Sequence, residues 1–330
     1  MAYKVVMTVD LGSTEIEERA LEAVGGQVAV SVCTTEEQLI ESCRDCDGVL
    51  VGANSPVTAR VIDSLERCRV LSRLGIGYSN IDVKAATAKR IAVTYVPDYC
   101  VGEVSDHALT MLLALARAIV PLNQSAKSGR WKKGFQELKQ PMRRLSGQTL
   151  GIVGLGKIGQ SLAAKAQALG LRTIAFDPYL SSERAQELGV ELVEMDFLLW
   201  HSDYVSLHAP LTETTKKLFS LAALKKMKPT AYLINSSRGG LVDERALYVA
   251  LTEGLIAGAG IDVTDPEPPQ SDNPLFRLDN VLITPHVSYY SEEADVELRR
   301  RSAEAVADVL QGRRPDDLVN PDVMAEATLQ

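Results

Sequence analysis

Short apolar runs alternate with amphipathic segments along the first hundred residues of the 330-residue chain. The runs are rich in Val, Ile and Leu and predict buried strands at residues 4–9, 27–32, 48–51, 70–74 and 91–96. Segments with helical spacing predict helices at residues 14–24, 56–65 and 81–89, and a further helix that begins near residue 34. Thr14 with Glu17, and Thr34 with Glu37, have the spacing of a capping box. Because strands and helices alternate with short connections, we expect a parallel sheet with helices on both faces.

A longer apolar segment follows Pro97. It predicts one helix over residues 102–128, apolar on so many sides that protein must cover it nearly all round. Its most apolar part is flanked by His107 and contains Arg117, so we expect it to be too short and too interrupted to span a membrane. Residues 138–147 are polar and irregular and predict a linker.

Residues 149–178 predict a strand, a glycine turn, a helix and a second strand, and the rest of the chain is organised around them. The turn reads Gly154-Leu155-Gly156-Lys157-Ile158-Gly159. In a dinucleotide-binding unit the first glycine permits the tight turn, the second lets the backbone approach the pyrophosphate, and the third lets the helix pack close to the strand. The phosphates lie at the helix N-terminus. A βα turn without a ligand is the alternative, but all the parts occur in register and favour a dinucleotide.

Asp177 ends the second strand of this unit, 18 residues after Gly159. An acid at this place accepts hydrogen bonds from the adenosine ribose hydroxyls. Its carboxylate would repel a 2′-phosphate, and no Arg follows it directly, since Pro178, Tyr179 and Leu180 come next. The sequence therefore favours NAD over NADP as the cofactor.

Further β/α pairs follow the glycine unit, and a long charged helix is predicted at residues 291–311. Because this helix lies beyond the last predicted strand, we expect it to cross back to the first domain. The predicted fold class is α/β, with two doubly wound parallel-sheet domains. A Rossmann cofactor domain, residues 101–290, would be inserted into a flavodoxin-like substrate domain formed by residues 1–100 and 291–330.

Composition limits the classes of partner. The net charge is −8 and no basic run occurs, which argues against nucleic acid as a partner. The first residues, MAYKVVMTVD, lack the pattern of a signal peptide, and we expect a soluble cytoplasmic protein. Five cysteines, an odd number, suggest reduced thiols. Cys43 and Cys46 form a CxxC, but no second Cys/His pair has ligand spacing, so no metal site is expected.

Three chemically reactive side chains follow predicted strands of the second domain: Arg238, Glu267 and His286. Because the carboxyl ends of parallel strands meet at one edge of a sheet, we expect these side chains to converge there. A histidinium can protonate the oxygen of a carbonyl that receives a hydride, a neighbouring carboxylate holds the imidazole, and a guanidinium binds a substrate carboxylate. The set suits hydride transfer to a 2-keto acid.

The other three histidines are weaker candidates for a proton carrier. His201 lies among polar residues and is expected at the surface, and His107 at the start of the apolar helix is expected to be structural. His208 follows a predicted strand. It either borders the cofactor or is a loop histidine whose hydrogen bonds the protein satisfies.

At these residues the sequence resembles the D-2-hydroxyacid dehydrogenases. The resemblance rests on the glycine turn with Asp177, on residues 235–244 (NSSRGGLVDE), on Pro266-Glu267-Pro268 and on Thr284-Pro285-His286. It implies that Arg238 is catalytic, that His286 is the acid/base and that Glu267 supports it. It also implies D stereochemistry and a homodimer formed through the cofactor domains. Within the family, residues 176–180, 200–203 and 290–292 look most like the C-terminal-binding-protein-like branch.

The resemblance implies further contacts. For the cofactor it implies Lys157, Ile158, Ala209, Thr215, Ser236, Ser237 and Asp262 in addition to the glycines and Asp177. For the substrate it implies Arg73, Gly75, Ile76 and Gly77, in a segment that looks like the family's carboxylate-binding loop, together with Tyr289. The branch has a tryptophan at the position of Tyr289, and many members of the family have an acid at that of Ser79. Both departures leave the substrate open.

Two functions from different classes compete. The first is an NAD-dependent dehydrogenase, or reductase of small 2-keto acids. The second is an NAD(H)-binding sensor or corepressor like the animal C-terminal-binding proteins. The intact set of Arg238, Glu267 and His286 favours the enzyme. A third possibility, a phosphoglycerate dehydrogenase, would want more cations near the substrate loop than Arg73 and Lys84.

Overall fold

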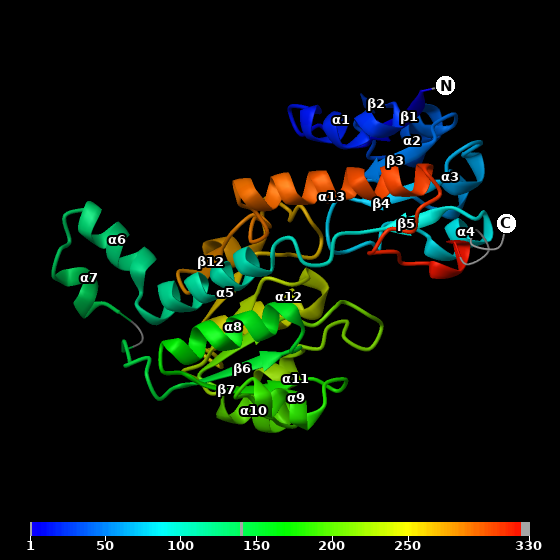
Figure 1. Cartoon of the computed structure of the whole chain (residues 1–330). Coiled ribbons are helices and arrows are strands. Elements are labelled where there is room, and N and C mark those ends of the chain that lie inside the picture. The colour runs from blue at the N-terminus through cyan, green and yellow to red at the C-terminus, as the bar shows by residue number, and fades with distance from the viewer. Residues whose placement is uncertain (1, 139–140, 325–330) are drawn as a thin grey trace. The chain divides into compact units, whose positions relative to one another are not determined.

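The computed structural model describes residues 2–138 and 141–324 (Figure 1). The chain forms two compact units. Unit 1 combines Met1–Tyr99 with Ser291–Gln330, and unit 2 is Cys100–Tyr290. Unit 1 contains a five-stranded sheet and unit 2 a seven-stranded sheet, and the strands of both pair in parallel. These sheets confirm the predicted α/β fold class.

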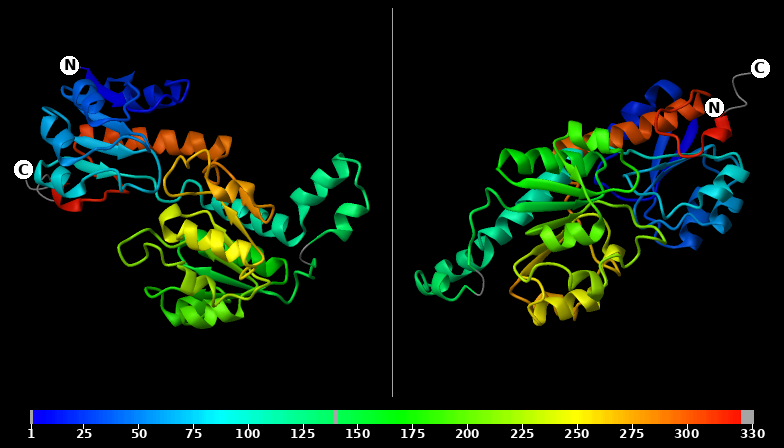
Figure 2. Two further views of the ribbon diagram at one scale, coloured as in Figure 1. Left: turned by 180° about the vertical axis from the view of Figure 1, so that it is seen from behind. Right: turned by 90° about the horizontal axis from the view of Figure 1, so that it is seen from below.

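The sheet of unit 1 has the order β2-β1-β3-β4-β5. Its strands are β1 (Tyr3–Met7), β2 (Gly26–Val30), β3 (Gly48–Val51), β4 (Val70–Arg73) and β5 (Ala92–Thr94). Helices α1 (Glu15–Leu21) and α13 (Glu292–Leu310) pack on one face, where Figure 2 shows α13 lying along the strands, and α2 (Glu36–Cys43), α3 (Ala59–Ser64) and α4 (Val83–Ala88) pack on the other. Because side chains alternate along a strand, Val5 and Met7 enter the core beneath α13 and Val6 enters the opposite core.

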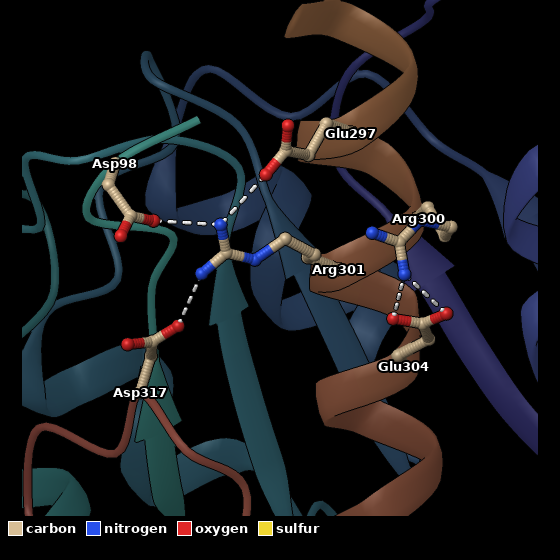
Figure 3. Close-up of polar contacts among 6 residues, drawn as sticks. All are labelled: Asp98, Glu297, Arg300, Arg301, Glu304 and Asp317. Atoms are coloured by element: carbon tan, nitrogen blue, oxygen red, sulfur yellow. Dashed lines mark hydrogen bonds and ion pairs between the residues drawn. The ribbon is translucent and has the colours of Figure 1, made fainter. Parts of the chain in front are cut away.

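Helix α13 is fixed to unit 1 by arginines. Buried Arg299 binds Glu17 of α1, with an Nε–Oε1 distance of 2.7 Å. Arg301 contacts three carboxylates, those of Asp98, Glu297 and Asp317 (Figure 3). Asp317 begins a segment that covers the edge strand β5, where Leu318 bridges Thr94 and the amide of Val319 donates to Val93. The edge of the sheet is thereby closed to pairing with other chains.

The sheet of unit 2 has the order β12-β11-β10-β9-β6-β7-β8. Its strands are β6 (Thr149–Val153), β7 (Arg172–Phe176), β8 (Glu191–Leu192), β9 (Tyr204–Leu207), β10 (Tyr232–Asn235), β11 (Gly258–Ile261) and β12 (Val281–Ile283). One face carries α5 (Val101–Ala116), α8 (Lys157–Ala168) and α9 (Ser182–Glu187), and the other carries α10 (Met195–His201), α11 (Leu221–Leu224) and α12 (Glu244–Thr252). The strand order reverses between β6 and β9, and ligands bind at such a switch point.

The predicted helix over residues 102–128 is wrong as a single element. The structure has α5 and then α6 (Ile119–Lys127), which meet at an angle of 59°. Ala118 lies between them in the left-handed region, with φ of 47°. Pro121 lacks an amide hydrogen and is tolerated only in the first turn of a helix, so the helix restarts just before it.

Helix α7 (Lys133–Gln136) follows α6. The described part of the predicted linker, residues 138 and 141–147, contains no helix or strand. Residues 139 and 140 lie outside the described residues. No single helix of residues 2–138 and 141–324 is long and apolar enough to cross a membrane. The bent pair α5–α6 together has the length and composition of a membrane span, and nothing else supports such a role for it.

Both predicted capping boxes are wrong. Thr14 caps α1 without a side-chain bond to the backbone, and its hydroxyl donates to Glu18 instead. Glu17 faces the interior, because it pairs with Arg299. In the second helix the cap is Thr35, whose box partner is Gln38.

We predict that Arg299→Ala lowers the free energy of unfolding by about 3–5 kcal/mol, because it leaves the fully buried Glu17 without its partner. Arg300→Ala is the matched control on the same helix. Arg300 pairs with Glu304 at the surface (Figure 3), and its loss should cost at most about 1 kcal/mol. Urea denaturation followed by circular dichroism measures both. Equal losses would contradict a stabilising role for the buried pair.

Candidate active site

The glycine loop after β6 is shaped by close packing. Gly154 has φ of +91°, and a Cβ on it would lie 2.7 Å from the amide nitrogen of Ala209. A Cβ on Gly159 would lie 2.4 Å from the carbonyl oxygen of Gly154. Only glycine fits at either position, so the loop turns tightly and α8 packs directly on it.

Gly156, by contrast, faces open space. It is the N-cap of α8, and a Cβ placed on it would meet no atom within 4 Å. The first turn of a helix has amide hydrogens without intrahelical acceptors, and its dipole favours an anion. Room and donors are therefore both present for a pyrophosphate at this helix end.

Asp177 borders this loop, and Ser236 lies at the end of β10 on the same edge of the sheet. The two carboxylate oxygens of Asp177 accept from the amides of Leu155 and Tyr179, at 2.8 and 2.9 Å, and each retains a further acceptor site. The hydroxyl of Ser236 is buried and has no hydrogen-bond partner among the described residues. An unmatched buried hydroxyl is costly, so a ligand group there would relieve it. With the glycine loop, these groups fit a dinucleotide.

Three other predicted cofactor contacts have partners within the chain. The hydroxyl of Ser237 donates to the carbonyl oxygen of Ala209 at 2.7 Å. That of Thr215 donates to the carbonyl oxygen of Pro210 at 2.6 Å. Ala209 itself is buried against Gly154. The structure thus gives these residues a role in shaping the loops, and their contact with a cofactor stays a prediction.

Glu267 and His286 lie together at the carboxyl edge of the sheet. Glu267 follows β11 and His286 follows β12, and the distance from Oε1 to Nδ1 is 2.5 Å. Since the carboxylate is the acceptor, Nδ1 carries the hydrogen and Nε2 stays available to a substrate. The Tyr289 ring lies edge-on to the imidazole, with 6.2 Å between the ring centroids.

His286 adopts a left-handed conformation, with φ of 52°, and Asp262 holds it there. The amide of His286 donates to the Asp262 carbonyl oxygen at 2.8 Å. The buried Asp262 carboxylate accepts from the hydroxyl of Thr284 and from the amides of Val287 and Ser288. Burial raises the pKa of Asp262, but these hydrogen bonds outweigh burial and set its pKa below the ordinary value. The carboxylate predicted to bind the cofactor thus has three donors from its own chain.

Thr284 also places His107. The Thr284 hydroxyl gives its one hydrogen to Asp262, at 2.6 Å, so it accepts from Nε2 of His107 at 3.0 Å. The structure thereby gives His107 the structural position that the sequence suggested.

Arg238 follows β10 and donates to the carbonyl oxygen of Ser237 at 2.6 Å. Within the described residues it makes no hydrogen bond or ion pair with Glu267 or His286. Its loop does pack on the loop of Glu267, because a Cβ on Gly239 would lie 2.0 Å from the carbonyl oxygen of Thr264. The structure thus brings the carboxylate of Glu267 and the imidazole of His286 into direct contact. Arg238 is connected to them only because its loop packs on the loop of Glu267.

Residues 109–288 match the family model described as "D-isomer specific 2-hydroxyacid dehydrogenase, NAD binding domain". Over 319 residues the chain is 39% identical to a glyoxylate reductase of Korarchaeum cryptofilum, which covers 94% of this chain and 95% of that protein. The chain belongs to the D-isomer specific 2-hydroxyacid dehydrogenase family. It is therefore an NAD-dependent oxidoreductase that acts on the CH–OH group of 2-hydroxy acids, and this confirms the predicted enzyme class and cofactor.

Other members of the family differ in substrate and length. The chain is 40% identical over 311 residues to a D-3-phosphoglycerate dehydrogenase of Methanocaldococcus jannaschii, which covers 93% of this chain, while the chain spans only 58% of that protein. The structure of an Aquifex aeolicus D-lactate dehydrogenase, complexed with NAD and lactic acid, superposes with a TM-score of 0.86 at 25% identity. That match covers 96% of this chain and 99% of the other.

The substrate contacts expected of this dehydrogenase fall in both units. Arg73 ends β4 in unit 1, and Gly75 has φ of +142°. A Cβ on Gly75 would lie 2.8 Å from the Arg73 guanidinium, so glycine leaves room for that side chain. Ile76 and Gly77 follow and are half-buried, and Tyr289 belongs to unit 2.

His208 is a half-buried histidine beside the end of β9. Its Nε2 lies 2.8 Å from the hydroxyl of Ser206, and burial lowers its pKa to about 4. His208 also lies beside the glycine loop, since a Cβ on Gly154 would be 2.8 Å from its carbonyl carbon, so both alternatives that the sequence left open stay predictions. Cys43 and Cys46 are buried, in the core of unit 1.

We predict that His208 makes the dehydrogenase sensitive to acid. An unfolded histidine takes up a proton near pH 6.5 and His208 in the folded chain only near pH 4, so between these values the unfolded state binds more protons. From pH 7 to pH 5 the free energy of unfolding should fall by about 2 kcal/mol more in the wild type than in His208→Gln.

Urea denaturation at the two pH values measures this difference. His201→Gln is the control, since His201 lies exposed at the end of α10, and it should behave as the wild type does. The same pH dependence in wild type and His208→Gln would contradict the assignment of a neutral imidazole at His208.

Proposed function

We propose that this dehydrogenase interconverts small 2-keto acids and D-2-hydroxy acids, with His286 as acid/base, Glu267 as its partner and Arg238 as the substrate-binding cation. The single observation that carries this proposal is the 2.5 Å contact between Glu267 and His286 on the sheet edge that also bears the glycine loop. All strands of unit 2 run parallel, so the ends of β6, β10, β11 and β12 share that edge.

Each side chain has a defined task in this proposal. NADH, when bound, supplies a hydride to the carbonyl carbon of the keto acid. Nε2–H of His286 gives its proton to the carbonyl oxygen, which becomes the hydroxyl. Glu267 holds the ring through Nδ1 and offsets the positive charge of the imidazolium. The guanidinium of Arg238 binds the substrate carboxylate and stabilises negative charge on the oxygen.

The cofactor would be held by the glycine loop and the first turn of α8 at its pyrophosphate, and by Asp177 at its ribose. The proposal also includes the other cofactor contacts that the sequence resemblance implies, which are Lys157, Ile158, Ala209, Thr215, Ser236, Ser237 and Asp262. The buried, unpartnered hydroxyl of Ser236 supports its inclusion most directly.

For the substrate we favour a small, unphosphorylated keto acid such as glyoxylate. A phosphate group needs Arg or Lys nearby, and the loop after Arg73, residues 74–82, contains neither. Besides Arg238, the proposed carboxylate contacts are Arg73, Gly75, Ile76 and Gly77. Tyr289, edge-on to His286, would limit the size of the substrate side chain.

We further propose a homodimer formed through unit 2. Helices α6 and α7 extend from α5 away from the seven-stranded sheet in every view (Figures 1 and 2). They and the turn between them expose Ile119, Val120, Trp131 and Phe135, and Trp131 is 79% exposed. An apolar surface of this kind suits burial against a second subunit. The resemblance to the C-terminal-binding-protein-like branch and the cytoplasmic location stay predictions.

The test is NADH oxidation by a panel of keto acids: glyoxylate, pyruvate, hydroxypyruvate, phenylpyruvate and 3-phosphohydroxypyruvate, with NADPH as the cofactor control. We expect turnover of a small member and little with NADPH. Tight NADH binding without turnover of any member would favour the competing sensor or corepressor function.

We predict that His286→Gln lowers kcat by a factor of about 10²–10⁴, because it removes the proton donor. NADH affinity, measured by fluorescence titration, should stay within about threefold, since the glycine loop is untouched. His201→Gln is the matched control and should keep full activity. Unchanged turnover in His286→Gln would overturn the assignment.

A further inference from the structure

The loop that carries Glu267 is exposed. Residues 265–268 all lie at the surface, so burial does not fix the position of the carboxylate that holds His286. The hydrogen bond to His286 is exposed as well, with side-chain exposures of 37% and 43%. Some contact outside this pair must therefore hold the loop in place.

Glu244, the first residue of α12, contacts the loop on either side of Glu267. Its Oε1 accepts from the amide of Asp265 at 3.0 Å, and its Oε2 accepts from Nδ2 of Asn273 at 3.0 Å. The carboxylate of Glu244 thus binds two residues, Asp265 and Asn273, that are eight positions apart in a largely exposed segment.

Glu244 and Asn273 both belong to segments that bury neighbouring side chains in the core of unit 2. Helix α12 buries Leu247 and Ala250 in the core of unit 2. Asn273 accepts from the amide of Leu275, whose side chain is buried in the same core. Glu244 therefore ties the exposed loop to two fixed parts of the unit.

A second contact comes from the same segment of chain. Gly239 lies against Thr264, where a Cβ would be 2.0 Å from the carbonyl oxygen and 2.1 Å from the carbonyl carbon. Residues 238–244 thus meet the Glu267 loop at two points, with Arg238 at one end of the segment and Glu244 at the other.

We propose that Glu244 is a positioning residue that holds Glu267 against His286 and keeps this pair in register with Arg238. This inference rests on the proposed function of the three residues. A carboxylate suits the task because both partners are donors and it has two acceptor oxygens, whereas a glutamine has one.

The kinetic test compares Glu244→Ala, Glu244→Gln and the control Glu253→Ala, which changes an exposed glutamate at the other end of α12. Glu244→Ala should lower kcat about tenfold, with KM and NADH affinity changed less than about twofold. Glu244→Gln should lie between, because it keeps one of the two bonds. Unchanged kcat in Glu244→Ala would overturn the inference.

A double-mutant cycle separates positioning from general weakening of the fold. If Glu244 acts through Glu267, adding Glu244→Ala to Glu267→Gln should lower kcat less than about twofold further. If the two factors multiply, Glu244 acts independently of Glu267 and the inference fails.

A spectroscopic readout does not depend on turnover. The chain has four histidines, and the Nδ1–H of His286 in its 2.5 Å hydrogen bond should give a downfield proton resonance in cofactor-free protein at low temperature, where exchange of this exposed proton with water is slow. Absence of the resonance from the wild type would overturn the premise that Glu267 is held against His286. Glu244→Ala should broaden or abolish this resonance, and Glu253→Ala should retain it. A resonance that persists in Glu244→Ala would overturn this inference and leave the proposed function intact. Loss of the resonance in a protein that reduces no keto acid would support the inference and refute the proposed function.

Discussion

The parallel direction of all seven strands is the constraint on which unit 2 depends. It places the ends of β6, β10, β11 and β12 along one edge, so four loops from distant parts of the sequence meet there. Each loop brings a different group to that edge: the glycine loop with the free amides of α8, the cation of Arg238, the carboxylate of Glu267 and the imidazole of His286. In the proposed function these loops carry the catalytic groups, while the sheet supplies only their common origin.

The sheet does not fix the conformation of the loops at such an edge. In this chain buried or half-buried carboxylates fix it by accepting hydrogen bonds from the loops. Asp262 binds donors on both sides of His286 and keeps that residue in a left-handed backbone conformation that non-glycine residues rarely adopt. Low pKa and burial make Asp262 a permanent acceptor. Local backbone strain at His286, the proposed acid/base, is thus maintained by hydrogen bonds within its own loop.

Much of the fold follows from the sequence, because apolar runs and glycine turns are local signals. The predicted strand at 48–51 agrees with the structure residue for residue. The break at Ala118 was missed because no glycine marks it. The cap at Thr34 was wrong because Thr35 fits the same pattern and Gln38 decides between them. Glu17 looked like a cap partner, but its role is set by Arg299, 282 positions away.

The candidate site, like the fold, could be predicted from the sequence only in part. Residue types at strand ends indicated Arg238, Glu267 and His286, since that placement is a property of the strand pattern. The contacts of Glu244 with Asp265 and Asn273, and the chain from His107 through Thr284 to Asp262, depend on loop conformations that no local pattern encodes. Gly239, where a Cβ would lie 2.0 Å from the carbonyl oxygen of Thr264, is a local signal that could have indicated this close approach of two backbones.

The most direct test of the account is a crystal structure of the dehydrogenase with NADH and oxamate, a stable analogue of a 2-keto acid. We predict that the oxamate carboxylate contacts the guanidinium of Arg238. We also predict that the amide carbonyl oxygen lies within about 3.2 Å of Nε2 of His286. Oxamate bound away from both side chains, with Nε2 of His286 facing solvent, would contradict it.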